Sequence, residues 1–122
     1  MSYSNAITST YTIKAQALTG GAATFLKVLG PKGRKGVLVG ISAVSTVAVT
    51  VAPTNVLVGA SGATNKYGTL DLPVAAIGSG YNNPTIAAVD SNVMPADTQV
   101  FIGTSGAATA GTADITVTIN WF

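Results

Sequence analysis

The chain has 122 residues, enough for one domain with its own hydrophobic core. It contains no cysteine and no histidine, and its only acidic side chains are Asp71, Asp90, Asp97 and Asp114. These counts exclude disulfides, thiolate metal sites and histidine-based catalysis. We therefore expect a protein that is not an enzyme and that binds no cofactor and no metal ion.

Charge is the most unusual property of the composition. Only 8% of the residues are charged, whereas 48% are hydrophobic; an ordinary soluble domain has roughly 25% charged residues. Because the cores of protein interfaces are depleted of charge, we expect other protein chains to cover much of the exterior. The alternative interpretation is a soluble domain whose surface is simply rich in Thr and Ala.

Alternating apolar and polar side chains, separated by turn residues, predict about eight short strands. In chain order they are expected at residues 10–18, 23–29, 37–44, 46–52, 69–72, 85–89, 98–104 and 114–121, with a further short strand or strand end at residues 56–58. Loops are expected at residues 30–36, 59–68 and 105–113. No segment combines a helical period with caps, so we expect at most one short helical turn.

Several strands have a predicted core face. Tyr11, Ile13, Ala15 and Ala17 share one face of the first strand, and Val47, Val49 and Val51 share one face of the fourth. In the last strand the core-facing residues are Ile115, Val117, Ile119 and Trp121.

These elements predict an all-β fold, a two-sheet antiparallel β-sandwich of the jelly-roll type. Residues 1–9 are expected to form an N-terminal arm and residues 10–122 a single sandwich domain, since no linker or repeat divides the chain.

The sequence contains no predicted targeting or membrane segment. Residues 1–10 lack the basic start and apolar core of a signal peptide, so we expect synthesis in the cytoplasm of the host cell. The longest uncharged apolar stretch, residues 37–52, is shorter than the ~20 residues of a membrane helix and contains Ser and Thr. No membrane partner is expected.

The loop at residues 30–36 (GPKGRKG) contains Lys32, Arg34 and Lys35, half of the six basic residues. It lacks the Gly-Lys-Ser/Thr ending of a phosphate-binding P-loop. The net charge of +2 and the absence of a basic stripe with aromatic residues argue against direct nucleic-acid binding. Two interpretations stay open, a solvated hairpin tip and a contact with an acidic surface of another protein.

The aspartates are isolated from one another and show no calcium-loop pattern. Asp97 precedes a predicted strand, and we expect it to be a turn residue whose carboxylate accepts a hydrogen bond from its own backbone.

Four apolar or aromatic residues are candidates for contacts with other proteins. Tyr67 and Tyr81 lie in predicted Gly- and Asn-rich loops and are expected to be exposed, where anchoring a protein contact is favoured over stacking on a sugar. Tyr3 and Ile7 lie in the otherwise polar arm. This arm is either a disordered tail or a strand that pairs with a neighbouring subunit.

The whole chain resembles the small decoration, or cement, proteins on the capsids of tailed bacteriophages. The resemblance rests on the Thr-, Ala-, Gly- and Val-rich composition, on Pro95-Ala-Asp-Thr98 before a strand, and on the terminal Ile115-Thr-Val-Thr-Ile-Asn-Trp121. It implies a jelly-roll-like homotrimer on the capsid exterior of the virion, which braces the major capsid protein. It transfers no site residues, so the expected capsid contacts come from the patterns above and are Tyr3, Ile7, Lys32, Arg34, Lys35, Tyr67 and Tyr81.

Two other functions stay open. One is a glycan-binding β-sandwich of a phage tail or fibre, with a shallow aromatic groove at Tyr67 and Tyr81. The other is a shell or fibre subunit that assembles by itself. A compact trimer in solution would support the cement function, a monomer the glycan module, and large closed particles the shell subunit.

Overall fold

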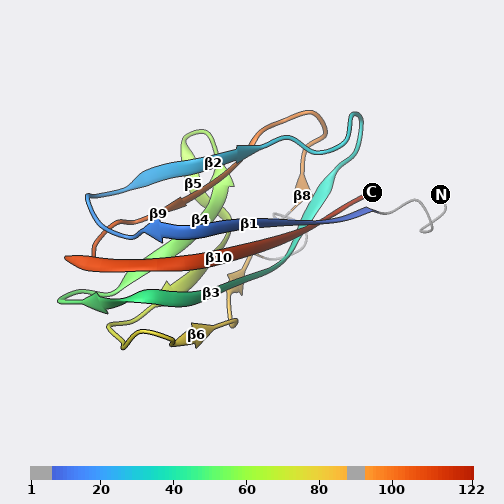
Figure 1. The fold of residues 1–122 in the computed structure, drawn as a ribbon. Coiled ribbons are helices and arrows are strands. Elements are labelled where there is room, and N and C mark those ends of the chain that lie inside the picture. Colours follow the sequence, from blue (N-terminus) through green and yellow to red (C-terminus); the bar gives the residue numbers. More distant parts are fainter. Residues whose placement is uncertain (1–6, 88–92) are drawn as a thin grey trace.

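The computed structural model describes residues 7–87 and 93–122, and this part of the chain contains no helix that could cross a membrane. Its ten strands are β1 (Ile7–Ala17), β2 (Ala23–Val28), β3 (Gly36–Thr50), β4 (Thr54–Ala60), β5 (Ala63–Leu72), β6 (Gly80–Tyr81), β7 (Thr85–Ile86), β8 (Val93–Met94), β9 (Val100–Thr104) and β10 (Ala110–Trp121). They form two antiparallel five-stranded sheets (Figure 1). The predicted all-β sandwich is confirmed.

The order of the strands defines the topology. Sheet A has the order β1-β10-β3-β6, with β8 also paired to β3, and sheet B has the order β2-β9-β4-β5-β7. The pairs are nested in the sequence: β1 with β10, β2 with β9, β3 with β6 and β8, and β4 with β5. A long hairpin that folds over on itself produces this nesting, which is the jelly-roll arrangement.

Strand β10 contributes the most regular part of the core. Its residues alternate strictly between buried and half-buried, as the sequence predicts. The buried row consists of residues that are at most 1% exposed, and these are Ala113, Ile115, Val117, Ile119 and Trp121. Full burial of one large aliphatic side chain contributes about 1.5–3 kcal/mol. Because β10 lies between β1 and β3, this row fixes the centre of sheet A.

The structure differs from the prediction in several strands, and β6 and β8 lie where no strand was expected. One strand of 15 residues, β3, replaces the two strands expected at residues 37–44 and 46–52. The loop expected at residues 59–68 is mostly strand, because β4 and β5 form a hairpin around Gly62, whose φ is +76°. Residues 64–66 are all exposed, so this part of β5 does not alternate between buried and exposed side chains. The sequence therefore shows no period of two there. Strand β1 begins at Ile7, inside the expected arm.

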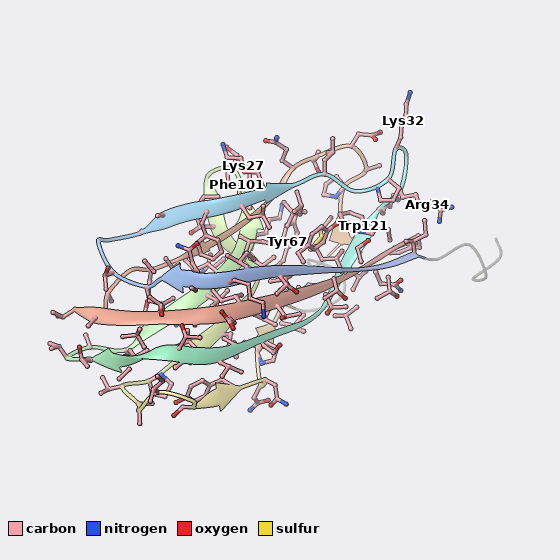
Figure 2. The ribbon with its side chains drawn as sticks, in the orientation of Figure 1. Lys27, Lys32, Arg34, Tyr67, Phe101 and Trp121 are labelled. Atoms are coloured by element: carbon pink, nitrogen blue, oxygen red, sulfur yellow. The ribbon has the colours of Figure 1, made fainter. Side chains whose placement is uncertain are left out.

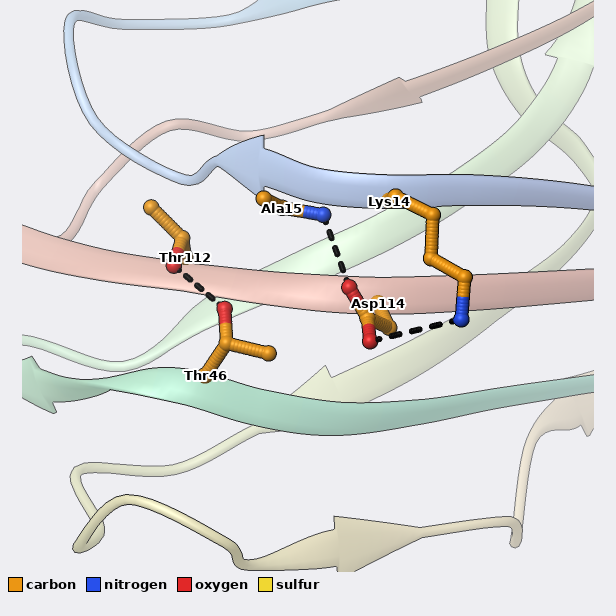
Figure 3. Close-up of polar contacts among 5 residues, drawn as sticks. All are labelled: Lys14, Ala15, Thr46, Thr112 and Asp114. Carbon is orange, nitrogen blue, oxygen red and sulfur yellow. Dashed lines mark hydrogen bonds and ion pairs between the residues drawn. The ribbon is translucent and has the colours of Figure 1, made fainter.

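A bulge in β1 changes which residues face the core. The register with β10 shifts after Ile13, and Ala15 has a φ of +49°. Ala15 and Ala17 are therefore exposed, and the prediction that they continue the core face is wrong. The Ala15 N–H donates a hydrogen bond to Oδ1 of Asp114 at 2.7 Å, and Lys14 Nζ lies 3.7 Å from Oδ2 (Figure 3).

A second irregularity interrupts β3, where its register with β10 shifts on both sides of Thr112. Val47 is 48% exposed and Val51 79%, whereas Val49 is 1% exposed. The prediction that these three valines share one face is wrong. The hydroxyl oxygens of Thr46 and Thr112 lie 2.6 Å apart and connect the two strands at this point (Figure 3).

The indole of Trp121 packs directly against backbone. A Cβ atom added to Gly36 would lie 2.6 Å from Cζ3 of Trp121, and one added to Gly30 would lie 2.5 Å from Cε3. Both distances are far below van der Waals contact, so only glycine leaves room for the ring. The two glycines that frame the basic loop in the sequence thus form part of the seat of the buried tryptophan.

This seat yields a stability prediction. Gly36→Ala should destabilise the fold by about 1–3 kcal/mol, the usual cost of overpacking a core. Gly40→Ala in the same strand is the matched control, because a Cβ there meets nothing within 4 Å. Urea unfolding measures both. Equal midpoints for the two variants would contradict the proposed packing.

The bulge in β1 yields a second prediction. Asp114→Ala should cost about 1–3 kcal/mol, because it leaves the Ala15 N–H without its carboxylate partner. Lys14→Ala should change stability by at most about 0–1 kcal/mol, because the lysine side chain is 77% exposed and surface ion pairs contribute little. Thermal unfolding separates the two, and a larger loss for Lys14→Ala would disprove this assignment.

Candidate interaction surface

The basic loop at residues 30–36 connects β2 to β3 at one end of the sandwich, next to the C-terminus (Figures 1 and 2). The N–H of Arg34 donates to the carbonyl oxygen of Pro31 at 3.1 Å and closes a tight turn. The backbone of Lys35 exchanges two hydrogen bonds with Phe122, at 3.0 and 2.8 Å. The loop is therefore attached to the residue that follows β10.

Asp97 holds the loop from the other side. Its Oδ1 accepts a hydrogen bond from the Gly33 N–H at 2.9 Å. The prediction that Asp97 bonds its own backbone is wrong. The local turn bond comes instead from the Thr98 hydroxyl, which donates to the carbonyl oxygen of Pro95 at 2.7 Å.

The three cations of the loop differ in their surroundings. Lys32 and Lys35 are exposed, whereas Arg34 is half-buried and has a contact of its own. Two lysines are thus presented to solvent from a backbone that Asp97 and Phe122 hold in place.

The two candidate tyrosines do not lie in exposed loops. Tyr67 lies in β5, is 1% exposed and belongs to the core, and desolvation by burial raises the pKa of its phenol. Tyr81 lies in β6 opposite Ala43 and packs against the core, half-buried. The prediction of two exposed anchors is wrong. A sugar cannot stack on a buried ring, so the structure does not favour a glycan groove built on Tyr67.

The candidates in the arm are divided by the start of β1. Ile7 pairs with Trp121 in sheet A and is 43% exposed, so it belongs to the sandwich. Tyr3 lies outside the described residues.

The carboxylates of the described residues have structural partners. Asp71 accepts a hydrogen bond from the Asn55 side chain, Asp97 from the basic loop, and Asp114 from the bulge in β1. Within residues 7–87 and 93–122, no group of three metal-ligating side chains lies together. Asp90 lies outside this part of the chain.

The sequence analysis missed a cluster of exposed aliphatic side chains at the edge of sheet A. This cluster, the apolar margin, consists of side chains that are 48 to 79% exposed, and these are Val44, Val47, Val51, Val74 and Ile77. Two pairs of backbone hydrogen bonds join β3 to the segment beside it. Val49 and Ala75 each donate to the carbonyl oxygen of the other, the Ser45 N–H donates to the carbonyl oxygen of Ser79, and the Gly78 N–H donates to the carbonyl oxygen of Ser45. The available signal was the absence of any charged residue at positions 36–65 and 72–89.

A second feature also escaped the sequence analysis. A hollow of about 420 Å³ lies beside the β4–β5 hairpin, lined in part by Lys66, Tyr67, Gln99 and Phe101. The Nζ of Lys66 lies 5.8 Å from the centroid of the Tyr67 ring, and Nζ of Lys27 lies 5.0 Å from that of Phe101. Figure 2 shows Lys27 next to Phe101. These two exposed lysines of sheet B interact with aromatic rings of their own chain.

Comparison with known proteins gives little further information. No family model matches the chain, and no curated protein matches it. A chain of the solved structure "Cyanophage Pam1 capsid asymmetric unit" is similar, with 19% identity and a TM-score of 0.49, over 96% of this chain and 84% of that one. A similarity at this level assigns no function to the chain.

The attachment of the basic loop can be tested by hydrogen exchange. Asp97→Gly removes the carboxylate but tolerates the φ of +59° at this position, so the Gly33 amide should exchange at least about ten-fold faster. Asp97→Asn keeps an oxygen acceptor and should retain most of the protection. The Lys35 amide, bonded to Phe122, serves as the internal reference. Unchanged exchange at Gly33 in Asp97→Gly would refute the contact.

Proposed function

We propose that this chain is a non-enzymatic structural protein of a phage virion. It is made in the host cytoplasm, joins the capsid exterior as a homotrimer, and stabilises the shell by bracing neighbouring major capsid subunits. The observation that carries the proposal is a β-sandwich whose edge exposes five large aliphatic side chains and whose sequence is only 8% charged. The resemblance to phage decoration proteins supports the same function.

The energetics of joining copies into the homotrimer follow from the exposed apolar side chains. The five residues of the apolar margin are exposed large aliphatic side chains, and exposed apolar patches of this kind mark interaction sites on soluble proteins. Burial contributes roughly 25 cal/mol per Å² of apolar area before the costs of association. A symmetric oligomer repeats each contact on the shell, so modest contacts add up to strong retention.

The basic loop supplies the contact with the shell. Lys32 and Lys35 project from a backbone that hydrogen bonds to Asp97 and Phe122 already hold, so binding costs little loop entropy. We assign these lysines to an acidic patch on a capsid subunit, where they orient the approaching protein.

The non-enzymatic part of the proposal rests on the chemistry of the side chains. Without histidine or cysteine, a catalytic base or nucleophile would have to come from the aspartates, tyrosines, lysines or hydroxyls. Asp71, Asp97 and Asp114 each accept a structural hydrogen bond.

Sedimentation with empty phage shells tests the function. The purified chain should pellet with the shells and saturate at a fixed ratio to the major capsid protein, and it should raise their melting temperature. Failure to bind any shell tested, together with binding on a glycan array, would overturn the proposal. Closed particles formed by the chain alone would instead identify a shell subunit.

The basic loop can be tested in the same assay. Lys32→Ala/Lys35→Ala should weaken shell binding by roughly ten-fold at low salt and flatten its salt dependence. The matched control is Lys27→Ala/Lys66→Ala, which also removes two positive charges, but from exposed lysines of sheet B. If both variants lose affinity equally, net charge and not the loop is responsible. If the loop variant binds with unchanged salt dependence, the loop does not contact the shell.

A further inference from the structure

The outer face of sheet A is built from rows of small polar side chains. On β10 the residues Thr116, Thr118 and Asn120 alternate with the buried core row and therefore point outward. Their partners on β1 are Thr12, Thr10 and Thr8, and their partners on β3 are Ser42, Gly40 and Val37. Three strands thus present three parallel rows that contain no charged residue.

The charges on this face neutralise one another. The ion pair of Lys14 and Asp114, with 3.7 Å between Nζ and Oδ2, lies beside the rows (Figure 3). Sheet B is different, because Lys27, Lys66 and Asp71 are exposed on its strands. Lys27 alternates with Val28, and Asp71 with Leu70, both of which are buried, so these two charges point away from the core. The sandwich therefore has one neutral broad face and one charged broad face.

The neutral face continues into the apolar margin. Val44 of β3 pairs with Asp114, next to the threonine rows. Ile77 lies beside β3, because the N–H of the next residue, Gly78, donates a hydrogen bond to the carbonyl oxygen of Ser45. The rows and the margin together form one surface, called here the sheet A surface. The part of it on β3 and the neighbouring segment comes from positions 36–65 and 72–89, which contain no charge.

We propose that copies of this chain contact one another through the sheet A surface. The inference rests on the proposed structural function and deepens it by naming the surface that the copies share. The partner that covers this surface is a second copy of the chain, because the surface complements itself in charge. It is neutral and presents one cation beside one carboxylate. A partner with a charged face would leave its own charges desolvated and unpaired there.

The chemistry of the rows agrees with this occupant. A threonine hydroxyl both donates and accepts, so a threonine row can pair with another threonine row in either direction. The methyl groups of the rows and the apolar margin supply the apolar area of the contact. Sheet B and the basic loop then remain on the outside of the assembly, where the loop reaches the capsid.

Size-exclusion chromatography with light scattering tests the inference on the whole chain. The wild-type protein should be an oligomer, and Thr10→Lys and Ile77→Lys should each raise its dissociation constant at least ten-fold. The matched control is Thr24→Lys, an exposed threonine on β2 of sheet B, which should leave the oligomer intact. Circular dichroism should show unchanged β structure in all three variants, because the substituted side chains are exposed.

Crosslinking gives a readout that does not depend on destabilising the oligomer. The chain has no cysteine, so a single introduced cysteine reports its own contacts. Thr12→Cys should crosslink between copies with a short bifunctional reagent, and Thr24→Cys should not.

Each outcome decides the inference separately from the function. A monomeric wild type that stays monomeric on shells overturns the inference and leaves capsid binding standing. An oligomer that survives Thr10→Lys and Ile77→Lys, or that Thr24→Lys disrupts equally, also overturns it. Oligomers that form through this face but bind no shell would keep the inference and overturn the proposed function.

Discussion

The pairing of β10 with both of its neighbours is the constraint on which the rest of the structure depends. This strand joins β1, at the start of the described chain, to β3, and it buries a row of side chains that ends with Trp121. Gly30 and Gly36 lie against the tryptophan ring, and Lys35 is hydrogen-bonded to Phe122 just after the strand. The position of the basic loop is therefore a consequence of how the last strand packs. Because these contacts join distant parts of the sequence, folding has to close long loops before the core forms.

The irregularities of sheet A are as important as its pairing. A sheet with so few charges risks pairing with other chains along its free edges, and natural proteins limit this risk with bulges and short edge strands. Strand β1 has a bulge at Ala15, stabilised by Asp114, and β3 is bordered by the two-residue strands β6 and β8. The same bulge brings the ion pair of Lys14 and Asp114 to the neutral face. The same few side chains thus limit pairing of other chains with the edge of sheet A and keep its outer face neutral.

The sequence predicted the parts of the fold where alternation is unbroken. β10 follows a strict period of two, and Ile115, Val117, Ile119 and Trp121 were identified correctly as core, although the strand begins at Ala110, inside the loop expected at residues 105–113. The pattern failed wherever a bulge or a hairpin added a residue: Val47 and Val49 have the same parity but opposite exposure, and Tyr67 is buried although Gly and Asn precede it. Such irregularities depend on the partner strand, which no local pattern contains. The apolar margin was missed for the same reason, because exposed and buried valines look alike in the sequence.

The distribution of charge separates the two contacts that we propose for this chain. Contacts through the sheet A surface involve neutral side chains, and their strength depends on apolar area and hydroxyl pairing, which salt screens little. A contact through Lys32 and Lys35 depends on screened charge and weakens as salt rises. In the proposed function, assembly of the copies and attachment to a shell are therefore governed by different forces and respond to different conditions. A chain with only ten charged residues can keep these two functions apart because it places its cations on the basic loop and sheet B, and almost none on sheet A.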